Sequence, residues 1–445
     1  MSEAPLLGSY RPDDVLAWEN GRPLASGRFV ADVARLAEDL PPRSTVFNLA
    51  RNRYRFLVGF GAALLRGQIT LLPQSRAPKI LAQIGRDYPD SYCLTDSHET
   101  VEGFSACRLG AFQDHPSCPP ELPKISNQRV AAVAFTSGST GKPRPNLKPW
   151  GSLVSVARQI AARTKLDSLK QITFVATVPH EHMFGLEASI MLPIQSGFAF
   201  HTGRPLFPED VRTSLCEVPP GRILVTTPIH LRACIAEGIQ LPQMELILSA
   251  TAPLPLAVAR QAENLFHTKV YEIYGFAEVG SVATRRTVVS DSWELLDGVQ
   301  VSKADNCCTV RADYLPAPVP FPDQISFNGP RTFVLHGRSA DLVNVAGHRA
   351  SLGHLNQKLN EIEGVEDGVF FLPEEDNEPV TRLTAFVVAP GKSAAQILDN
   401  LRAAIAPALL PRPLYLVSSL PRNDVGKLTR DALFELAHRL KREGR

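Results

Sequence analysis

Net charge, long apolar runs and cysteine motifs are all scarce in this sequence, and each scarcity excludes a class of protein. The formal charge is only +2 over 445 residues, so no bulk attraction to nucleic acid or to an anionic membrane is expected. The longest clean apolar run, Phe56 to Leu65, is far too short to span a bilayer. The seven cysteines form no C-x-x-C pair, which leaves a disulfide framework or a zinc site without support. We therefore expect neither a nucleic-acid partner nor a membrane span.

The first residues, MSEAPLLGSYRPDD, are acidic and lack the basic flank and apolar core of a secretory signal. The scattered cysteines fit a reducing compartment. Both features predict a cytoplasmic protein. A chain of 445 residues with 44% hydrophobic content is long enough for a large core divided between two or three domains.

Helical and strand-like patterns alternate along most of the chain. A buried helix is predicted from Tyr54 to Leu65, and a short strand follows in GQITLLP. Further strand-like runs occupy residues 130–135, 171–179, 221–228, 244–250 and 269–275. This alternation predicts an α/β fold whose sheets are parallel or mixed and covered by helices.

The sequence changes character after Asp297-Gly298. A proline-rich stretch, LPAPVPFPDQ, precedes FVLHGRSADL, and a unit of roughly a hundred residues follows, which is a plausible domain size. We place the boundary between Arg338 and Asp341. The predicted domains are a large N-terminal region, residues 1–338, and a small C-terminal region, residues 339–445.

The stretch FTSGSTGKPRPNLKPW, residues 135–150, combines hydroxyl side chains, glycines and a lysine. It is not a Walker A loop, because two residues separate Gly138 from Gly141 and a proline follows Lys142. Pro143 also prevents a phosphate-binding helix from starting directly there, which argues against a P-loop kinase. Flexible glycines and hydroxyl donors suit an anion-holding flap, but the same composition suits a plain surface linker.

TSGSTGKP closely resembles the signature loop of the acyl-adenylate-forming superfamily, which includes acyl-CoA synthetases, nonribosomal peptide adenylation domains and luciferases. Further segments resemble that family in its order: VPHEHMFG, LSATAPLP, YGFAE, FPDQ, GRSADLVNVAGHR and LPRNDVGKLTR. Several motifs in fixed order are far more specific than one. The resemblance extends from about Asp14 to Ala437. It implies an enzyme that uses ATP and Mg²⁺ to join a small carboxylic acid to AMP, with a small, mobile α+β C-terminal domain that carries the catalytic lysine.

The resemblance assigns ATP-binding roles across these segments. Asp323 would accept hydrogen bonds from the ribose hydroxyls, Tyr274 would stack on adenine, and Arg338 follows Asp323 at the family's spacing. Because FPDQ lacks the family's usual T-G-D, a simple turn aspartate is the alternative interpretation of Asp323. The predicted ATP-binding residues are Thr136, Ser137, Gly138, Ser139, Thr140, Gly141, Lys142, Ala250, Thr251, Ala252, Tyr274, Gly275, Phe276, Ala277, Asp323 and Arg338.

Lys427, Glu278 and His182 are predicted to be catalytic. A positive charge near the α-phosphate would offset the repulsion between the attacking carboxylate and the nucleotide, and the resemblance gives this role to Lys427. Glu278 would hold Mg²⁺, and His182 would flank the acyl group. Without the resemblance, Lys427 fits a solvated lysine and Glu278 an exposed strand-end glutamate. Ala277 stands where the family usually has threonine, so one phosphate contact is missing.

The acyl pocket is expected to be compact. Ala250 and Thr251 replace two glycines that are usual in the family, and Phe184 and Phe276 belong to neighbouring motifs. These features favour an aryl acid, such as 4-hydroxybenzoate, over a long straight chain. The pocket residues implied by the resemblance are His182, Phe184, Gly185, Ser249, Ala250, Thr251 and Gly280.

The segment after the boundary is expected to serve a second half-reaction. The resemblance places the hinge at Ala340 or Asp341. It places Gly347 in the strand that lines the pantetheine tunnel, and Arg349 in contact with phosphate. The chain looks most like the ligases of aryl polyene and xanthomonadin pigment pathways, which load an aryl acid onto an acyl carrier protein.

Two alternatives to carrier-protein loading stay open. Coenzyme A carries the same pantetheine thiol, so a CoA ligase for an aryl or medium-chain acid is the second hypothesis. A nucleotide-binding regulator without turnover is the third, suggested by Ala277, Asn344 and the altered pair Ala250-Thr251. The basic helix end with Arg439, Lys441 and Arg442 suits an acidic carrier but also a solvated helix face.

Overall fold

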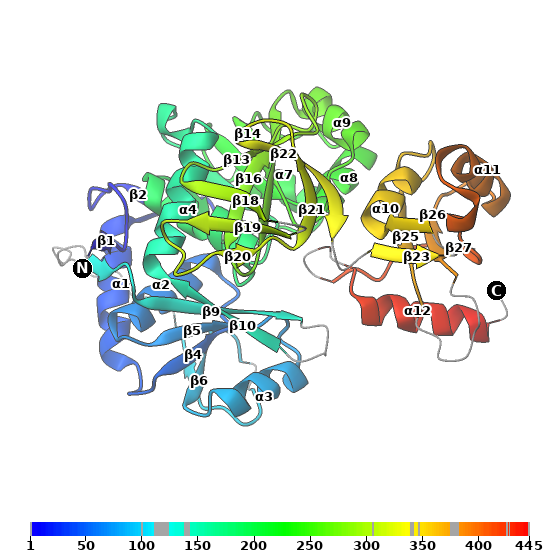
Figure 1. Ribbon diagram of the computed structural model, residues 1–445. Coiled ribbons are helices and arrows are strands. Elements are labelled where there is room, and N and C mark those ends of the chain that lie inside the picture. Colours follow the sequence, from blue (N-terminus) through cyan, green and yellow to red (C-terminus); the bar gives the residue numbers. More distant parts are fainter. Residues whose placement is uncertain are drawn as a thin grey trace.

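The computed structural model describes residues 2–98, 101–110, 124–137, 143–304, 307–338, 342–345, 348–373, 382–423, 426 and 428–443. A large lobe of two main sheets precedes a small C-terminal lobe (Figure 1). Within these ranges no helix has both the length and the apolarity to cross a membrane. Cys93, Cys107, Cys216, Cys234 and Cys308 are free thiols. The cytoplasmic location stays a prediction.

The first sheet has six strands in the order β10-β9-β5-β4-β6-β7. Its neighbouring strands are parallel except for β9 and β10, which form an antiparallel hairpin. The predicted strand in GQITLLP is confirmed as β5. The strands are β4 (Thr45–Asn48), β5 (Ile69–Leu72), β6 (Ser91–Thr95), β7 (Ala106–Arg108), β9 (Val130–Ser137) and β10 (Pro143–Pro149).

The second sheet has eleven strands in the order β21-β22-β17-β16-β15-β14-β13-β11-β12-β2-β3. It is parallel from β2 to β15 and antiparallel beyond β15. Four of the remaining strand predictions are confirmed in this sheet as β11, β13, β14 and β15, and the fifth is confirmed as β9 of the first sheet. The bounds are β2 (Val15–Glu19), β3 (Arg22–Ala25), β11 (Thr173–Ala176), β12 (Ala199–His201), β13 (Arg222–Thr226), β14 (Leu246–Ser249), β15 (Lys269–Phe276), β16 (Gly280–Arg285), β17 (Trp293–Leu295), β21 (Asp323–Phe327) and β22 (Thr332–Arg338).

Helices fill the space between the two sheets and cover their outer faces. Apolar residues of α1, α2, α4 and α6 pack with strands of both sheets in one core. Helix α3 covers the other face of the first sheet, and α7, α8 and α9 cover the other face of the second. The helix bounds are α1 (Ser26–Asp39), α2 (Arg53–Leu65), α3 (Pro78–Asp87), α4 (Trp150–Arg163), α5 (Met183–Leu186), η2 (Glu187–Met191), α6 (Leu192–Ser196), α7 (Pro208–Cys216), α8 (Pro228–Ala236) and α9 (Leu256–Phe266). Two small sheets complete the lobe: β1 (Glu3–Pro5) with β8 (Lys124–Ser126), and β18 (Val299–Ala304), β19 (Cys307–Ala312) and β20 (Val319–Pro320).

The small lobe is an α+β unit built on the sheet β25-β26-β27. Phe370 and Val387 pack with α10 and α11 on one face, whereas Phe371 and Phe386 pack with α12 on the other. This alternation is what a strand covered on both faces requires. The bounds are β23 (Leu342–Val345), β24 (His348–Ser351), α10 (Leu352–Asn360), β25 (Asp367–Phe371), β26 (Thr384–Val388), α11 (Ala394–Ala404), β27 (Leu414–Leu416) and α12 (Arg430–Arg442).

The two lobes meet at the end of β22. Gly337 has φ +110°, and a Cβ at this position would come within 2.1 Å of the Ser351 Oγ. Glycine suits this position because it adopts the positive φ and leaves room for the Ser351 side chain. The predicted hinge residues, Ala340 and Asp341, lie outside the described residues, so the division at residues 338 and 339 stays a prediction.

Arg53 joins α2 to the second sheet. Its side chain is 1% exposed and donates hydrogen bonds to the carbonyls of Val178 (3.0 Å), His201 (3.2 Å) and Gly203 (2.7 Å) and to the Ser189 Oγ (3.2 Å). Burial lowers the pKa of Arg53 to about 10, so the guanidinium keeps its charge near neutral pH. These bonds fix the loops at the carboxyl ends of β11 and β12 against the first sheet's helix.

Replacing Arg53 with methionine should strongly destabilise the large lobe. The change leaves several buried carbonyls without donors, so we expect the free energy of unfolding to fall by about 3 kcal/mol or more. Urea unfolding followed by circular dichroism measures the loss. Arg158→Met on the exposed side of α4 is the matched control. Equal stability of the two variants would show that Arg53 does not hold the sheets together.

Candidate active site

The carboxyl ends of β11, β13, β14 and β15 lie along one edge of the second sheet, because these strands are parallel. Ligands of open α/β sheets bind at this edge. Two predicted ATP segments, 250–252 and 274–277, lie at the ends of β14 and β15. Ser249, the last residue of β14, has a buried Oγ without a hydrogen-bond partner among the described residues. A ligand at this edge could supply the missing partner.

The predicted ribose and adenine residues meet between β15 and β21. The Tyr274 hydroxyl donates a hydrogen bond to the Asp323 carboxylate. Asp323 opens β21 and pairs across the strands with Arg338, whose backbone alone is described. Phe321, which was not predicted, packs nearly parallel to the Tyr274 ring, with centroids 5.6 Å apart. Three predicted residues from separate segments are therefore neighbours, and an aromatic contact orients Tyr274 towards Asp323.

The loop after β14 holds a strained residue at a predicted ligand position. Thr251 has φ +78°, in the left-handed region that disfavours β-branched side chains. Glu272 fixes the far end of this loop: its Oε1 accepts from the Leu254 N–H at 2.8 Å, and its Oε2 accepts from Arg285 Nε at 2.6 Å. Strain of this kind concentrates at functional sites, where surrounding structure maintains it.

Glu278 is exposed in the turn between β15 and β16. β15 stops at Phe276, so Glu278 lies just beyond the strand and not at its end as predicted. An exposed carboxylate fits Mg²⁺, which takes one or two protein carboxylates and completes its shell with water and phosphate oxygens. Within the described part of the chain, no group of three His, Cys, Asp or Glu residues could hold a metal. Magnesium here would depend on nucleotide phosphates as well as on Glu278.

Residues 138–142 connect β9 to β10. Ser137 pairs with Pro143 and Thr136 with Arg144, so antiparallel strands flank the predicted phosphate loop. The next helix, α4, begins only at Trp150. The loop itself, Gly138, Ser139, Thr140, Gly141 and Lys142, lies outside the described residues, and its phosphate role stays a prediction.

Four predicted acyl-pocket residues, His182, Phe184, Gly185 and Gly280, lie in or next to α5 and β16, which pack together. His182 directly precedes α5, which contains Phe184 and Gly185. A Cβ on Gly185 would lie 1.8 Å from the Pro179 carbonyl oxygen, and a Cβ on Gly280 would lie 2.3 Å from Oε1 of Glu187. Glycine at both positions therefore allows the wall of the predicted pocket to close.

Glu187 and Lys148 are buried charged residues beside this wall that the sequence reasoning missed. Each is 2% exposed. The Glu187 Oε2 accepts hydrogen bonds from the Ser281 N–H (3.0 Å) and Oγ (2.6 Å). Burial raises the pKa of Glu187, partly countered by Ser281 and by the charge of Lys148. Burial lowers the pKa of Lys148 to about 8, partly countered by the carboxylates of Glu187 and Glu278. The sequence does contain one indication of this site, because Glu187 is a charged residue within the apolar run GLEASIML.

Lys427 lies outside the described residues, but its neighbours on both sides are placed. Arg422 and Leu428 form an antiparallel bridge that closes the loop between them. Gly426 is buried there, and a Cβ on it would lie 3.4 Å from Ile229 and 3.9 Å from the Thr227 Oγ1. Thr227 follows β13 directly, so the segment carrying the lysine reaches the same sheet edge. Gly347 is not described, and only the backbone of Arg349 is.

The chain belongs to the family of AMP-binding enzymes, whose family model matches residues 33–305. A 4-coumarate–CoA ligase of Rhodobacter capsulatus is 30% identical over 283 residues, which are 64% of this chain and 70% of that protein. A 3-hydroxybenzoate–CoA/4-hydroxybenzoate–CoA ligase of Thauera aromatica is 22% identical over 376 residues, 73% of this chain and 70% of that protein. The family recognised in the sequence motifs is confirmed; the pigment-pathway subtype stays a prediction.

Solved structures of adenylate-forming enzymes share the fold. ATP-bound MatB from Rhodopseudomonas palustris has a TM-score of 0.81 at 17% identity, covering 97% of both chains. The o-succinylbenzoate CoA synthetase of Bacillus subtilis, in complex with ATP and magnesium, has a TM-score of 0.80 at 17% identity, covering 97% of this chain and 99% of that one. These similarities confirm the predicted α/β fold with a large N-terminal and a small C-terminal lobe.

The depressed pKa of Lys148 predicts a pH-dependent stability. An unfolded lysine keeps its proton up to about pH 10.5, whereas the folded protein releases it from about pH 8. Unfolding therefore takes up a proton in this window, so the free energy of unfolding rises with pH. Relative to Lys148→Met, the wild type should gain roughly 3 kcal/mol between pH 8 and 10.5, as measured by urea unfolding. Lys79→Met on α3 controls for the loss of a lysine charge, and a pH-independent difference from Lys148→Met would contradict the assignment.

Proposed function

We propose that the protein is an ATP- and Mg²⁺-dependent acid–thiol ligase that adenylates an aryl acid and transfers the acyl group to the pantetheine thiol of coenzyme A. One observation carries this proposal: the Tyr274–Asp323 contact and the Gly426 loop lie at the same edge of the second sheet. A nucleotide held at the first would be within reach of a lysine carried by the second. Membership of the AMP-binding enzyme family supports the same chemistry.

The reaction has two balanced steps. A carboxylate oxygen of the acid attacks the α-phosphorus of ATP, the bond to the bridging β-phosphate oxygen breaks, and pyrophosphate leaves with the electron pair. The thiol sulfur then attacks the acyl carbonyl, AMP leaves with the bonding electrons, and the thiol proton passes to solvent. Lys427 would balance negative charge in the first step, and His182 would border the acyl group. Glu278 would hold Mg²⁺, which neutralises phosphate charge when bound.

Coenzyme A is favoured as the acceptor because the sequence relatives described above are named as CoA ligases. The carrier protein predicted from the sequence becomes the alternative. In either case Gly347 and Arg349 would line the path of the pantetheine arm, and rotation about Ala340 or Asp341 would expose it.

An aryl acid is favoured by the wall of the predicted pocket. Thr251 stands where the resembling family has glycine, and Phe184 lies in α5, so the space for a long chain is reduced. Glu187 and Lys148 add buried hydrogen-bonding capacity beside Gly280. A ring bearing a hydroxyl, as in 4-hydroxybenzoate, would satisfy that capacity better than an unsubstituted ring.

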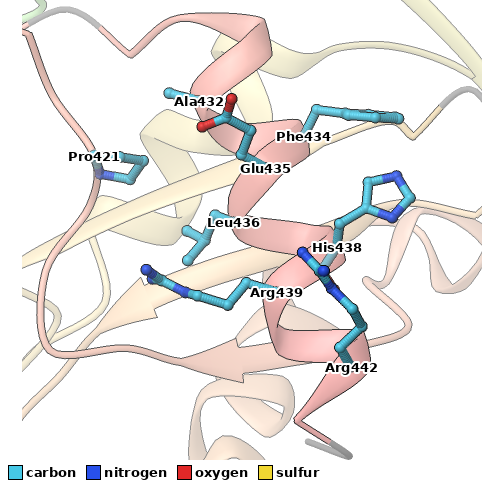
Figure 2. Close-up of a pocket in the computed structure, with 8 residues that line it drawn as sticks. All are labelled: Pro421, Ala432, Phe434, Glu435, Leu436, His438, Arg439 and Arg442. Carbon is cyan, nitrogen blue, oxygen red and sulfur yellow. The ribbon is translucent and has the colours of Figure 1, made fainter.

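A surface on α12 favours the carrier protein as a second acceptor. Figure 2 shows Phe434 and His438 on one side of α12 and Arg439 directed towards Pro421 across a shallow depression. Phe434 is 41% exposed, and its ring centroid is 4.3 Å from that of His438. An exposed aromatic residue beside Arg439 and Arg442 suits the acidic surface of a helical partner.

The function is tested by pyrophosphate exchange with aryl and aliphatic acids, followed by mass analysis of products. We expect exchange with 4-hydroxybenzoate, release of AMP, and a thioester with coenzyme A. A thioester formed with holo-carrier protein in place of coenzyme A would select the alternative acceptor. Background exchange with every acid, despite ATP binding, would favour the regulator without turnover. Release of ADP would overturn the adenylate mechanism.

Replacing Glu187 with glutamine should change the preference among acids. The amide keeps the size of the side chain but loses its charge. We expect kcat/KM for 4-hydroxybenzoate to fall about tenfold or more, with a smaller change for benzoate, because the ring hydroxyl would meet a neutral amide, a weaker acceptor than a carboxylate. Glu38→Gln, an exposed residue near the end of α1, is the control. Equal losses for both acids would show that Glu187 does not select the ring substituent.

A further inference from the structure

Asp367 connects the two lobes at the loop that carries Lys427. This residue opens β25 in the small lobe and is largely buried, with 17% of its side chain exposed. Its two oxygens bind Arg422 in a bidentate pair: Nε to Oδ2 at 2.8 Å and Nη2 to Oδ1 at 2.7 Å. Bidentate guanidinium–carboxylate pairs fix geometry as well as charge.

Arg422 also binds Gly426, the residue before Lys427. Its Nη1 donates a hydrogen bond to the Gly426 carbonyl at 2.7 Å. The Gly426 N–H donates to the Asn423 carbonyl at 2.8 Å. Together with the bridge from Arg422 to Leu428, these bonds fix Gly426 and Leu428, the residues on either side of Lys427.

Arg232 brings the large lobe into the same contact. It lies on α8, which starts directly after Thr227, and its Nη1 donates to the Glu366 carbonyl. The same nitrogen is 3.8 Å from Oδ1 of Asp367. Asp367 therefore lies between a cation of the large lobe and a cation of the lysine loop. Without the carboxylate, these two guanidinium groups would repel each other.

We propose that Asp367 is a positioning residue for adenylation, holding the small lobe on Arg232 and the Lys427 loop through Arg422 in one arrangement. The inference rests on the proposed function. Because Asp367 acts through this docked arrangement, it matters when acyl-AMP forms. It contributes little once the small lobe leaves this position for thioester formation.

The two half-reactions separate this role from a general structural one. In Asp367→Asn we expect pyrophosphate exchange to slow about 10–100-fold, because small misplacements of a catalytic group have effects of this size. Thioester formation from supplied 4-hydroxybenzoyl-AMP and coenzyme A should stay within about twofold of the wild type. Arg232→Gln should show the same split. Glu363→Gln, an exposed residue just before β25, is the matched control.

Hydrogen–deuterium exchange gives a readout that does not depend on activity. Amides of residues 422–428 should exchange faster in Asp367→Asn than in Glu363→Gln, while the amides of α12 stay unchanged. Equal slowing of both half-reactions, no slowing of either, or unchanged exchange of the loop would overturn the inference. A wild type that lacks pyrophosphate exchange with every acid would instead refute the proposed function, and loop exchange would still decide the role of Asp367.

Discussion

The buried guanidinium of Arg53 joins two sheets that have no strand in common. It lies at the start of α2, a helix of the first sheet, and its partners are carbonyls at or just beyond the ends of β11 and β12 in the second. Loops at strand ends cannot satisfy their carbonyls within the sheet, and burial without a partner is costly. One arginine supplies several donors at once, which fixes the loops after β11 and β12 beside the edge where Ser249 and Tyr274 lie.

The loops along that edge are held in fixed conformations by close packing, and one of them contains a strained residue. Gly185 allows α5 to approach the Pro179 carbonyl, and Gly280 allows β16 to approach Glu187 of η2. Thr251 keeps a left-handed conformation while Glu272 anchors the end of its loop. The costs of these features are offset by the large core behind them. The protein's own contacts therefore give this edge a fixed shape.

The sequence was sufficient for features set by local patterns. Apolar runs of strand length located β11, β13, β14 and β15, because buried parallel strands must be apolar throughout. Ordered motifs located Tyr274 and Asp323, although their hydrogen bond joins residues that no local pattern relates. Arg53, Lys148 and Asp367 could not be found in this way. Their roles depend on partners distant in the chain, such as Gly203 for Arg53, and charge in a sequence normally indicates an exposed side chain.

The contacts between the lobes explain how one chain could serve two half-reactions. Each lobe has separate cores, and among the described residues no apolar cluster includes members of both. Described contacts across the junction include small or polar ones: Gly337 with Ser351, Gly426 with Ile229, and Arg232 with Asp367. A partly exposed ion pair contributes roughly 1 kcal/mol or less, so docking is favoured only slightly. Differences in ligand affinity of a few kcal/mol would then be enough to shift the lobes between arrangements without disturbing either core.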